Sequence, residues 1–478
     1  METKEQMIDY LQCDVSSFGF QDLYDLVISK NNCISCGICV SICPRLSIEE
    51  NYPTLTQYDP ECSLCYKYCP RTYFPEDLFE NEIFKGKTKK DTLLGNYQSI
   101  YGAKTVDEDI LKVAQNGGIV SSILIHALET NMIDGVLMSI RDEDWRPKPF
   151  IARTREEILS AAGSIYAIAP TLSIYNDTVY KYKIERLAFV GMPCQIQAVR
   201  KLQLSPPLSS ELGIFKLVIG LFCSYNYSYE LMKNMIFSLT GISMNQIGKF
   251  DVTRGKFLVY LKNNKLKEIP IKDTKKFYWS SCRYCKDYTA EFADMSIGSI
   301  GSPGDNWNSV IIRSEIGETV FNELINSKRI KYTIGLDVNM IKKASQKKKL
   351  RTTLLNDNII SLMQLLNITE QEARVYSTLL SLGKANLQML SEVMKLNPEE
   401  IRKSINWLVQ RGWVFSTNGY FRPNQPIIIL KKEIKELKKS FEQKISALKS
   451  EVLNSLEDLY LQNNLNTVKS EDFSNILL

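Results

Sequence analysis

The spacing of the cysteines constrains this chain more than any other feature of its sequence. Twelve cysteines occur in 478 residues, and the first close group reads Cys33-x2-Cys36-x2-Cys39-x3-Cys43-Pro44. Bacterial 4Fe–4S segments use this spacing, with three thiolates on one cluster and the fourth on another. The proline ends the local helix and directs the chain away. A zinc ribbon would need two CxxC pairs but neither the third cysteine nor the proline. The run therefore predicts an iron–sulfur site.

A second group, Cys62-x2-Cys65-x3-Cys69-Pro70, matches the last three positions of the same run, and its missing first position falls on Asp59. Because the last cysteine of each run crosses over, the predicted ligands of cluster one are Cys33, Cys36, Cys39 and Cys69. Those of cluster two are Cys43, Cys62, Cys65 and Asp59. A carboxylate holds cluster iron less firmly than a thiolate, which predicts a labile 4Fe–4S or a 3Fe–4S cluster. The alternative is that Asp59 is only a turn residue before Pro60, and the sequence favours neither.

Four further cysteines follow apolar strand-like runs or lie in a polar loop, namely Cys194, Cys223, Cys282 and Cys285. Functional residues concentrate at such places, so these four suggest a third 4Fe–4S cluster. The alternative from spacing alone is a pair of buried free thiols plus a redox or zinc CxxC. Cys13 has no partner in the sequence and is expected to be a packed thiol.

The first residues, the hydrophobicity of the chain and the single histidine argue against a secreted protein, a membrane protein and a histidine-dependent enzyme. Met1 to Lys4 lead into a polar stretch without the apolar core of a signal peptide, and no window of 18 apolar residues could span a membrane. We therefore expect a cytoplasmic protein, in which disulfides are rare. His126 lies in an apolar run, so Ser–His or Cys–His catalysis and a histidine-bound zinc are close to excluded. The formal net charge of +5 favours no class of partner.

Hydrophobic patterning divides the chain into consecutive domains. We predict an N-terminal helical lead with a ferredoxin-like two-cluster segment, an α/β domain of alternating strands and helices, a basic linker, a winged helix-turn-helix and a long amphipathic helix. Their boundaries are 1–90, 91–340, 341–364, 365–430 and 431–478.

The two C-terminal domains have clear local signals. The box Thr369-x-x-Glu372 and the pair Asn397-Pro398 are helix starts, and Asn418-Gly419 is a hairpin turn. Apolar residues then recur at steps of three or four from Ile434 to Leu459. This pattern fits a homodimeric coiled coil, or a helix that packs back on its own domain.

Glycine-rich segments in the α/β domain suggest a phosphate-bearing cofactor. Glycines at a helix start expose backbone N–H groups to an anion, but no Rossmann fingerprint is present. Electrons that clusters carry singly usually meet a two-electron carrier at a flavin. The candidate cofactor-binding residues are Asn116, Gly117, Gly118, Gly163, Ser164, Tyr166, Gly191, Gln195, Gly298, Gly301 and Gly304.

Three sets of residues resemble a known family. They are Gln115-Asn116-Gly117-Gly118, then Gly191-x-Pro193-Cys194-Gln195, and finally Cys282-Arg283-x-Cys285-x-Asp287 with Ala293-Asp294-x-Ser296-x-Gly298. Residues 30–335 resemble the beta subunit family of coenzyme F420 hydrogenases and dehydrogenases. The resemblance implies FAD and a 4Fe–4S cluster in the α/β domain, with hydride exchange between coenzyme F420 and the flavin. It also favours the third cluster at the four later cysteines, and it implies a redox partner protein or a larger electron-transfer complex.

Residues 365–460 resemble the archaeal TrmB-like sugar-responsive regulators. The predicted recognition helix carries Arg402, Lys403 and Arg411 against Glu399 and Glu400, a small basic surface that suits DNA or a protein partner equally well. The expected function is thus an F420-dependent oxidoreductase subunit. The alternatives are a redox-sensing transcription regulator and a flavin/iron–sulfur reductase of another organic substrate.

Overall fold

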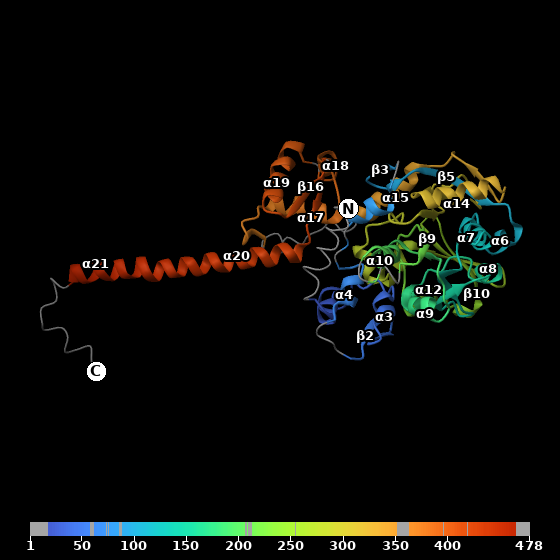
Figure 1. Cartoon of the computed structure of the whole chain (residues 1–478), viewed down its shortest axis with the longest axis horizontal. Coiled ribbons are helices and arrows are strands. Elements are labelled where there is room, and N and C mark those ends of the chain that lie inside the picture. The colour runs from blue at the N-terminus through green and yellow to red at the C-terminus, as the bar shows by residue number, and fades with distance from the viewer. Residues whose placement is uncertain are drawn as a thin grey trace. The chain divides into compact units, whose positions relative to one another are not determined.

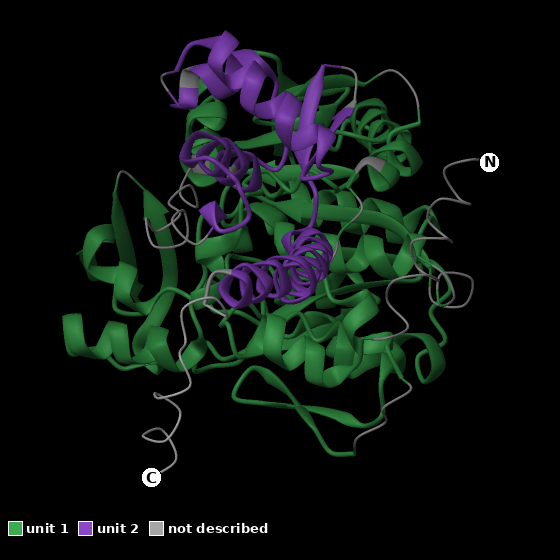
Figure 2. Ribbon diagram, turned by 90° about the vertical axis from the view of Figure 1, so that its left-hand side faces the viewer, with its two compact units in different colours: residues 1–352 green, residues 353–478 purple. Residues whose placement is uncertain are grey.

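The computed structural model describes residues 18–57, 62–72, 74, 76–85, 88–205, 208, 213–253, 255–350, 363–394, 396–417 and 419–464. The chain forms two compact units, residues 1–352 and residues 353–478, which Figure 2 shows in green and purple. Each unit is described by itself below. In the described part of the chain, no helix is long and apolar enough to cross a membrane.

An eight-stranded mixed sheet forms the centre of the first unit (Figure 1), with the strand order β15-β5-β14-β13-β9-β8-β6-β7. Strands β13, β9, β8 and β6 are parallel, whereas β14, β5, β15 and β7 pair antiparallel with their neighbours. The bounds are β5 Ser99–Thr105, β6 Gly135–Arg141, β7 Pro147–Ala152, β8 Leu187–Gly191, β9 Phe215–Leu221, β13 Met295–Gly298, β14 Asn308–Ile312 and β15 Ile330–Thr333.

Alternation of side chains gives this sheet two apolar faces, because successive residues of a strand point to opposite sides. In β8, Ala188 and Val190 enter one core, whereas Leu187 and Phe189 enter the other. The first core also contains residues of α6 (Glu108–Val113), α7 (Ile119–Glu129), α8 (Arg155–Ser160) and α14 (Glu315–Asn326). The second contains residues of η2 (Thr171–Ile174), α9 (Tyr175–Tyr180) and α10 (Pro193–Leu204). The predicted α/β core is confirmed, and it consists of the sheet with a layer of helices on each face.

The N-terminal segment packs into the second of these cores through Ile34, Cys36, Ile38, Tyr68 and Phe79. Its hairpin turns through Glu50 and Asn51, both at positive φ, as a tight two-residue turn requires. The elements are α2 Phe20–Leu23, η1 Tyr24–Ile28, α3 Ile38–Ile42, β1 Leu46–Glu49, β2 Tyr52–Leu55, α4 Leu64–Tyr68, α5 Glu76–Ile83, β3 Lys89–Asp91 and β4 Gly95–Tyr97.

A smaller three-stranded sheet, in the order β10-β11-β12, packs with α12 around a separate aromatic core. Trp145, Phe250 and Phe257 are fully or nearly fully buried there. The elements of this part are α12 Tyr229–Thr240, η3 Met244–Gln246, β10 Ile247–Thr253, β11 Lys256–Leu261, β12 Leu266–Pro270, α13 Ile271–Thr274, η4 Lys275–Phe277 and η5 Ser280–Tyr284.

The basic run from residue 341, which the sequence predicted as a linker, is part of a helix in the structure. Residues 341–350 belong to helix α15 (Val338–Leu350), and Ile341, Ser345, Lys348 and Lys349 on it are buried. The prediction was wrong for these residues because distant parts of the same unit supply hydrogen-bonding and acidic partners for them. Lys342 pairs with Asp91, and Lys349 pairs with Glu291. Residues 351–362 lie outside the described residues.

Within its described residues, the second unit has three helices and a two-stranded hairpin, followed by a long helix. The predicted capping box of Thr369 and Glu372 is confirmed, and Asn397 caps the third helix ahead of Pro398. Asn418 of the predicted hairpin turn lies outside the described residues. The elements are α17 Glu370–Leu382, α18 Leu387–Met394, α19 Pro398–Gln410, β16 Val414–Thr417, β17 Tyr420–Pro423, α20 Pro426–Ala447, η6 Leu448–Leu453 and α21 Asn454–Asn464.

Candidate iron–sulfur and cofactor sites

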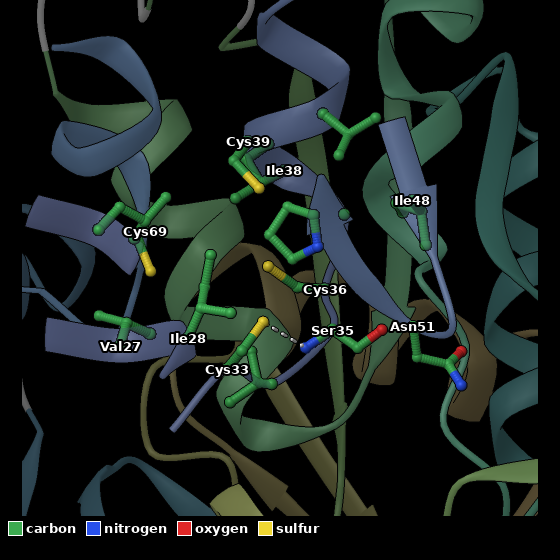
Figure 3. A pocket seen from close by; sticks show the side chains of 15 residues that line it. Val27, Ile28, Cys33, Ser35, Cys36, Ile38, Cys39, Ile48, Asn51 and Cys69 are labelled. Atoms are coloured by element: carbon green, nitrogen blue, oxygen red, sulfur yellow. Dashed lines mark hydrogen bonds between the residues drawn. The ribbon is translucent and has the colours of Figure 1, made fainter. Parts of the chain in front are cut away.

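Four cysteines of the N-terminal segment line one cavity, and Figure 3 shows their sulfur atoms around a common space. They are Cys33, Cys36, Cys39 and Cys69, the set that the crossed arrangement assigns to cluster one. Gly37 makes the local geometry possible, because it caps α3 at φ 87°, and a Cβ there would lie 2.6 Å from the backbone N of Ser173. The glycine thus lets Cys36 and Cys39 follow one another around the same space.

Burial keeps the four cysteines of this cavity protonated as long as no iron is bound. Burial, with a smaller contribution from the nearby Cys69, raises the pKa of Cys33 to about 12. Burial also raises the pKa of Cys36, Cys39 and Cys69. Two backbone N–H groups already donate to sulfur, those of Ser35 to Cys33 and of Arg71 to Cys69, each at 3.4 Å. A donor set of four mutually close thiols fits an iron–sulfur cluster, whose ligands must be thiolates.

The second N-terminal set is only partly described. Cys43 and Cys65 lie in one apolar core with Leu23 and Leu46. Burial raises the pKa of Cys65 to about 12, and the charges of Cys43 and Cys62 add to this rise. Cys65 is therefore near Cys43 and Cys62, and the charge of Cys69 from the first set acts on it as well. Asp59 lies outside the described residues.

The four later cysteines, far apart in sequence, line a second cavity. Cys194 is the second residue of α10, directly after β8, and Cys223 follows the end of β9. Cys282 lies in η5, and Cys285 ends it. Since β8 and β9 are parallel neighbours, their carboxyl ends meet at one edge of the sheet, where ligands of α/β proteins bind.

Residues that sequence reasoning did not single out complete this second cavity. Ile34, Arg71, Trp279 and Lys348 line it together with the cysteines. Arg71 follows Cys69 by two residues, a proximity that could have signalled its role. Lys348 gave no such signal, because it belonged to a basic run that resembled a linker. The cations act on the thiols: burial by itself would raise the pKa of Cys285, but the charges of Lys348 and Arg71 lower it below its usual value.

The two cysteine-lined cavities are immediate neighbours. Ile34 lines both of them. The indole Nε1 of Trp279, from the wall of the second cavity, donates to the carbonyl of Cys33 at 2.8 Å. The described cysteines are free thiols, and no group of three or more His, Cys, Asp or Glu in the described ranges is arranged for a single metal ion. A 4Fe–4S cluster differs from a single ion in this respect, because it spreads its four thiolates over four irons.

Part of the predicted cofactor set gathers at the start of α7. Gly118 caps this helix at φ 70° without a side-chain cap, and half-buried Asn116 and buried Gly117 precede it. The backbone N of Ser164 donates to Oε1 of Gln115 at 3.4 Å, which brings the segment of Gly163 and Tyr166 to the same place. Oδ1 of Asn308 accepts from the backbone N of Ile119 at 3.4 Å, so one N–H group of this helix start already has a partner. The other N–H groups of a helix start beside a glycine turn suit a phosphate group.

Most of the other predicted cofactor residues contact protein atoms. The amide of Gln195 donates to the carbonyl of Ala169 and accepts from the backbone N of Met192, so it fixes the turn before Cys194. A Cβ on Gly298 would lie 2.0 Å from the ring of Phe222. Gly191 and Gly301 face protein atoms in the same way, and Gly304 faces open space.

Together, the mixed α/β sheet and the cysteine-lined cavities define an iron–sulfur electron-transfer protein. Comparison with known sequences gives the family. Residues 100–176 and 184–334 match the N-terminal and C-terminal parts of the coenzyme F420 hydrogenase/dehydrogenase beta subunit. Residues 26–49 match a 4Fe–4S binding domain, and residues 362–426 match the sugar-specific transcriptional regulator TrmB. The chain belongs to the coenzyme F420 hydrogenase/dehydrogenase beta subunit family, and it combines this fold with a TrmB-type winged helix.

Named relatives are consistent with this assignment. The coenzyme F420 hydrogenase subunit beta of Methanococcus voltae is 42% identical over 234 residues, 49% of this chain and 83% of the relative. The coenzyme F420-dependent sulfite reductase of Methanocaldococcus jannaschii is 32% identical over 347 residues, 68% of this chain and 52% of the relative. A chain of the F420-reducing [NiFe] hydrogenase complex from Methanosarcina barkeri has a TM-score of 0.54 and 31% identity, covering 58% of this chain and 96% of that chain.

Proposed function

We propose that this protein is an F420-linked oxidoreductase subunit that exchanges a hydride with coenzyme F420 and passes single electrons through iron–sulfur clusters to a redox partner protein. The observation that carries this proposal is the adjacency of the two cysteine-lined cavities, which share Ile34. One cavity lies at the carboxyl edge of the α/β sheet, and the other lies in the N-terminal segment. Carriers held in two cavities that share a lining residue would be neighbours, as electron exchange between them requires.

The chain's own residues would hold three clusters. Cluster one would take the N-terminal set of the first cavity, and cluster three would take the set of the second cavity. Cluster two would take Cys43, Cys62 and Cys65, with Asp59 as its fourth ligand or with a ligand from outside the protein. Bound clusters supply one-electron transfer. The residues around them exclude water, since Cys36, Cys39, Cys65 and Cys285 are all buried.

A flavin, proposed as FAD, would supply the step between hydride transfer and single-electron transfer. The residues proposed to contact its phosphates are those around the start of α7, namely Asn116, Gly117, Gly118, Gly163 and Ser164. The side-chain amide of Gln195 is already used by Met192 and Ala169, so it does not fit as a direct contact, whereas Gly191, Gly298 and Gly301 stay predictions. No acidic or basic side chain needs to donate a proton for the hydride step, which agrees with the single histidine of the sequence.

The test uses the full chain, purified without oxygen and reconstituted with iron, sulfide and FAD. We expect reduction of an acceptor dye by reduced coenzyme F420, and about twelve irons per chain at four irons per cubane. Cys285→Ala should remove about four irons and the dye activity, whereas Ser280→Ala, in the same short helix, should retain both. Absence of any exchange with coenzyme F420 in either direction would refute the proposal. A screen of other organic substrates would then test the reductase alternative.

A second candidate function, redox-responsive DNA binding, is favoured by the winged helix in the second unit. Helix α19 exposes Arg402, Lys403 and Asn406 on its surface, although Arg402 also contacts Glu399 at 3.7 Å. Arginine and asparagine can read base edges in the major groove, and lysine can contact phosphates. Sequence-selective binding that changes between oxidised and reduced protein would support this function. No binding to DNA even at low salt would exclude it.

We also propose that α20, η6 and α21 pair with the same helix of a second copy. The apolar stripe along this helix is 39–64% exposed and consists of Ile434, Leu437, Phe441, Ile445, Leu448, Val452, Leu456 and Leu459. Its steps of three, four and four repeat every eleven residues, a period that gives a nearly straight or slightly right-handed pair. Residues 431–444 carry six lysines and three acids, whereas residues 445–464 carry one lysine and three acids. Antiparallel pairing would place these opposite charges side by side.

A further inference from the structure

Two cationic side chains, half-buried Arg71 and buried Lys348, reach the second cavity from outside the part of the chain that matches the beta subunit family. Arg71 comes from the N-terminal segment, and Lys348 comes from the last turn of α15, beyond residue 334, where that match ends. Both side chains line the cavity together with Cys194, Cys223, Cys282 and Cys285. Neither cation has a role in binding iron, so their presence among the thiols needs a separate explanation.

The guanidinium of Arg71 is only partly satisfied: it hydrogen-bonds to Cys285, but two of its nitrogens have no partner among the described residues. Its Nε and Nη2 atoms are buried and have no hydrogen-bond acceptor. Burying a charged group with unmade hydrogen bonds costs free energy unless a counter-charge lies nearby. The charges that act on it belong to the sulfurs of Cys285, Cys194 and Cys282. A negatively charged group in the cavity would therefore satisfy it.

Lys349 has a carboxylate partner, whereas the neighbouring Lys348 donates to a backbone carbonyl. Lys349 pairs with the carboxylate of Glu291 at 2.6 Å and so joins α15 to the domain. Lys348 is also buried, but its Nζ donates to the backbone carbonyl of Cys223 at 2.6 Å. Asp287 is the carboxylate whose charge acts on Lys348 along with the thiols, and its Oδ1 has no hydrogen-bond partner in the described structure. Lys348 thus places its charge beside the cysteines.

We propose that Arg71 and Lys348 are positioning residues that raise the reduction potential of a cluster held by Cys194, Cys223, Cys282 and Cys285. A cubane with four thiolates is negatively charged, and reduction adds one more negative charge. Net charge and burial set the potential of such clusters, and fixed cations in a dry cavity stabilise the more negative form. This inference rests on the proposed function, since it requires a cluster at these cysteines.

The positions of the two cations predict different ranges of influence. Arg71 lies between the two cysteine sets, because its backbone N donates to the sulfur of Cys69 while its side chain lines the second cavity. Lys348 lines only the second cavity. Loss of the Arg71 charge should therefore lower the potentials of clusters one and three, whereas loss of the Lys348 charge should lower that of cluster three.

The experiment is an EPR-monitored redox titration of the full chain, reconstituted with iron and sulfide, for Arg71→Gln and Lys348→Gln. The matched control is Arg283→Gln, which removes an exposed cation one residue after Cys282. Signals are assigned by their loss in Cys36→Ala and Cys285→Ala. At the wild-type midpoint, we expect the reduced-to-oxidised ratio of cluster three to fall at least about tenfold in both variants, or about 59 mV for one electron. The control should not change it.

Unchanged titration of cluster three in both variants would overturn the inference. So would an equal shift in Arg283→Gln, because the effect would then be that of any nearby charge. Arg71→Lys, which keeps the charge, should titrate close to the wild type and replaces Arg71→Gln if that variant does not fold. Retention of all iron when Cys282 and Cys285 are both replaced by alanine is a different outcome, since it would refute the cluster itself and with it the proposed function.

Discussion

A buried ion pair between Arg200 and Asp294 holds together the elements that carry two of the candidate ligands. Nη2 of Arg200, on α10, lies 2.9 Å from Oδ1 of Asp294, and the two side chains are only 4% and 7% exposed. Oδ2 of Asp294 also accepts from the backbone N of Val218 on β9 at 2.7 Å, and Oδ1 accepts from Ser314 at 2.8 Å. Helix α10 begins beside Cys194, and β9 ends beside Cys223, so Asp294 fixes the separation of these cysteines.

Asp294→Asn keeps the size of the side chain but leaves Arg200 charged and buried. Breaking one partner of a buried pair costs about 3–5 kcal/mol. Amides of β8, β9 and β13 that exchange through opening of this region should then exchange roughly 150- to 5,000-fold faster, at 1.36 kcal/mol per tenfold. Hydrogen exchange followed by mass spectrometry on the reconstituted protein measures this effect peptide by peptide. The same variant should hold less iron at the second cavity.

A control variant and a double variant test whether the unpaired charge of Arg200 causes the faster exchange. Asp109→Asn breaks an ion pair with Lys112 whose side chains are 65% and 70% exposed, and it should leave exchange in the sheet unchanged. Asp294→Asn combined with Arg200→Met should be less destabilised than the two single changes added together, because no unpaired charge remains. Exchange at the wild-type rate in Asp294→Asn, or full additivity in the double variant, would contradict the reasoning.

Three further predictions follow from packing, protonation and the exposed stripe. Gly298→Ala should destabilise the first unit by about 1–3 kcal/mol in thermal unfolding, because the new methyl group overlaps Phe222, whereas Gly304→Ala faces open space and should not. Iron release to a chelator should accelerate as the pH falls. Burial raises the pKa of the thiols of the first cavity in the iron-free fold, so protons compete with iron more strongly at lower pH; release independent of pH would contradict this. Leu437→Asp with Ile445→Asp should convert a dimer to a monomer in light scattering, and an unchanged mass would exclude the stripe as the contact.

Local signals in the sequence predicted local structure well. The Thr369 capping box and the Asn397-Pro398 helix start depend on contacts within one turn, and both are present. The alternating strands of the central domain also follow from their own residues. The basic run from residue 341 was misjudged because its helix is stabilised by Asp91 and Glu291, which are distant in sequence. Propensity carries no information about such partners.

The sequence by itself determined that the N-terminal segment carries a 4Fe–4S ligand motif. Close cysteine spacings, such as those from Cys33 to Cys43, can be read directly because one short segment supplies most ligands of a cluster. Only the tertiary structure decided which distant groups meet: it brought Cys194, Cys223 and Cys285 together at one edge of the sheet, and it added Arg71 and Lys348. The physical reason is that strand order, and not spacing along the chain, sets these neighbours.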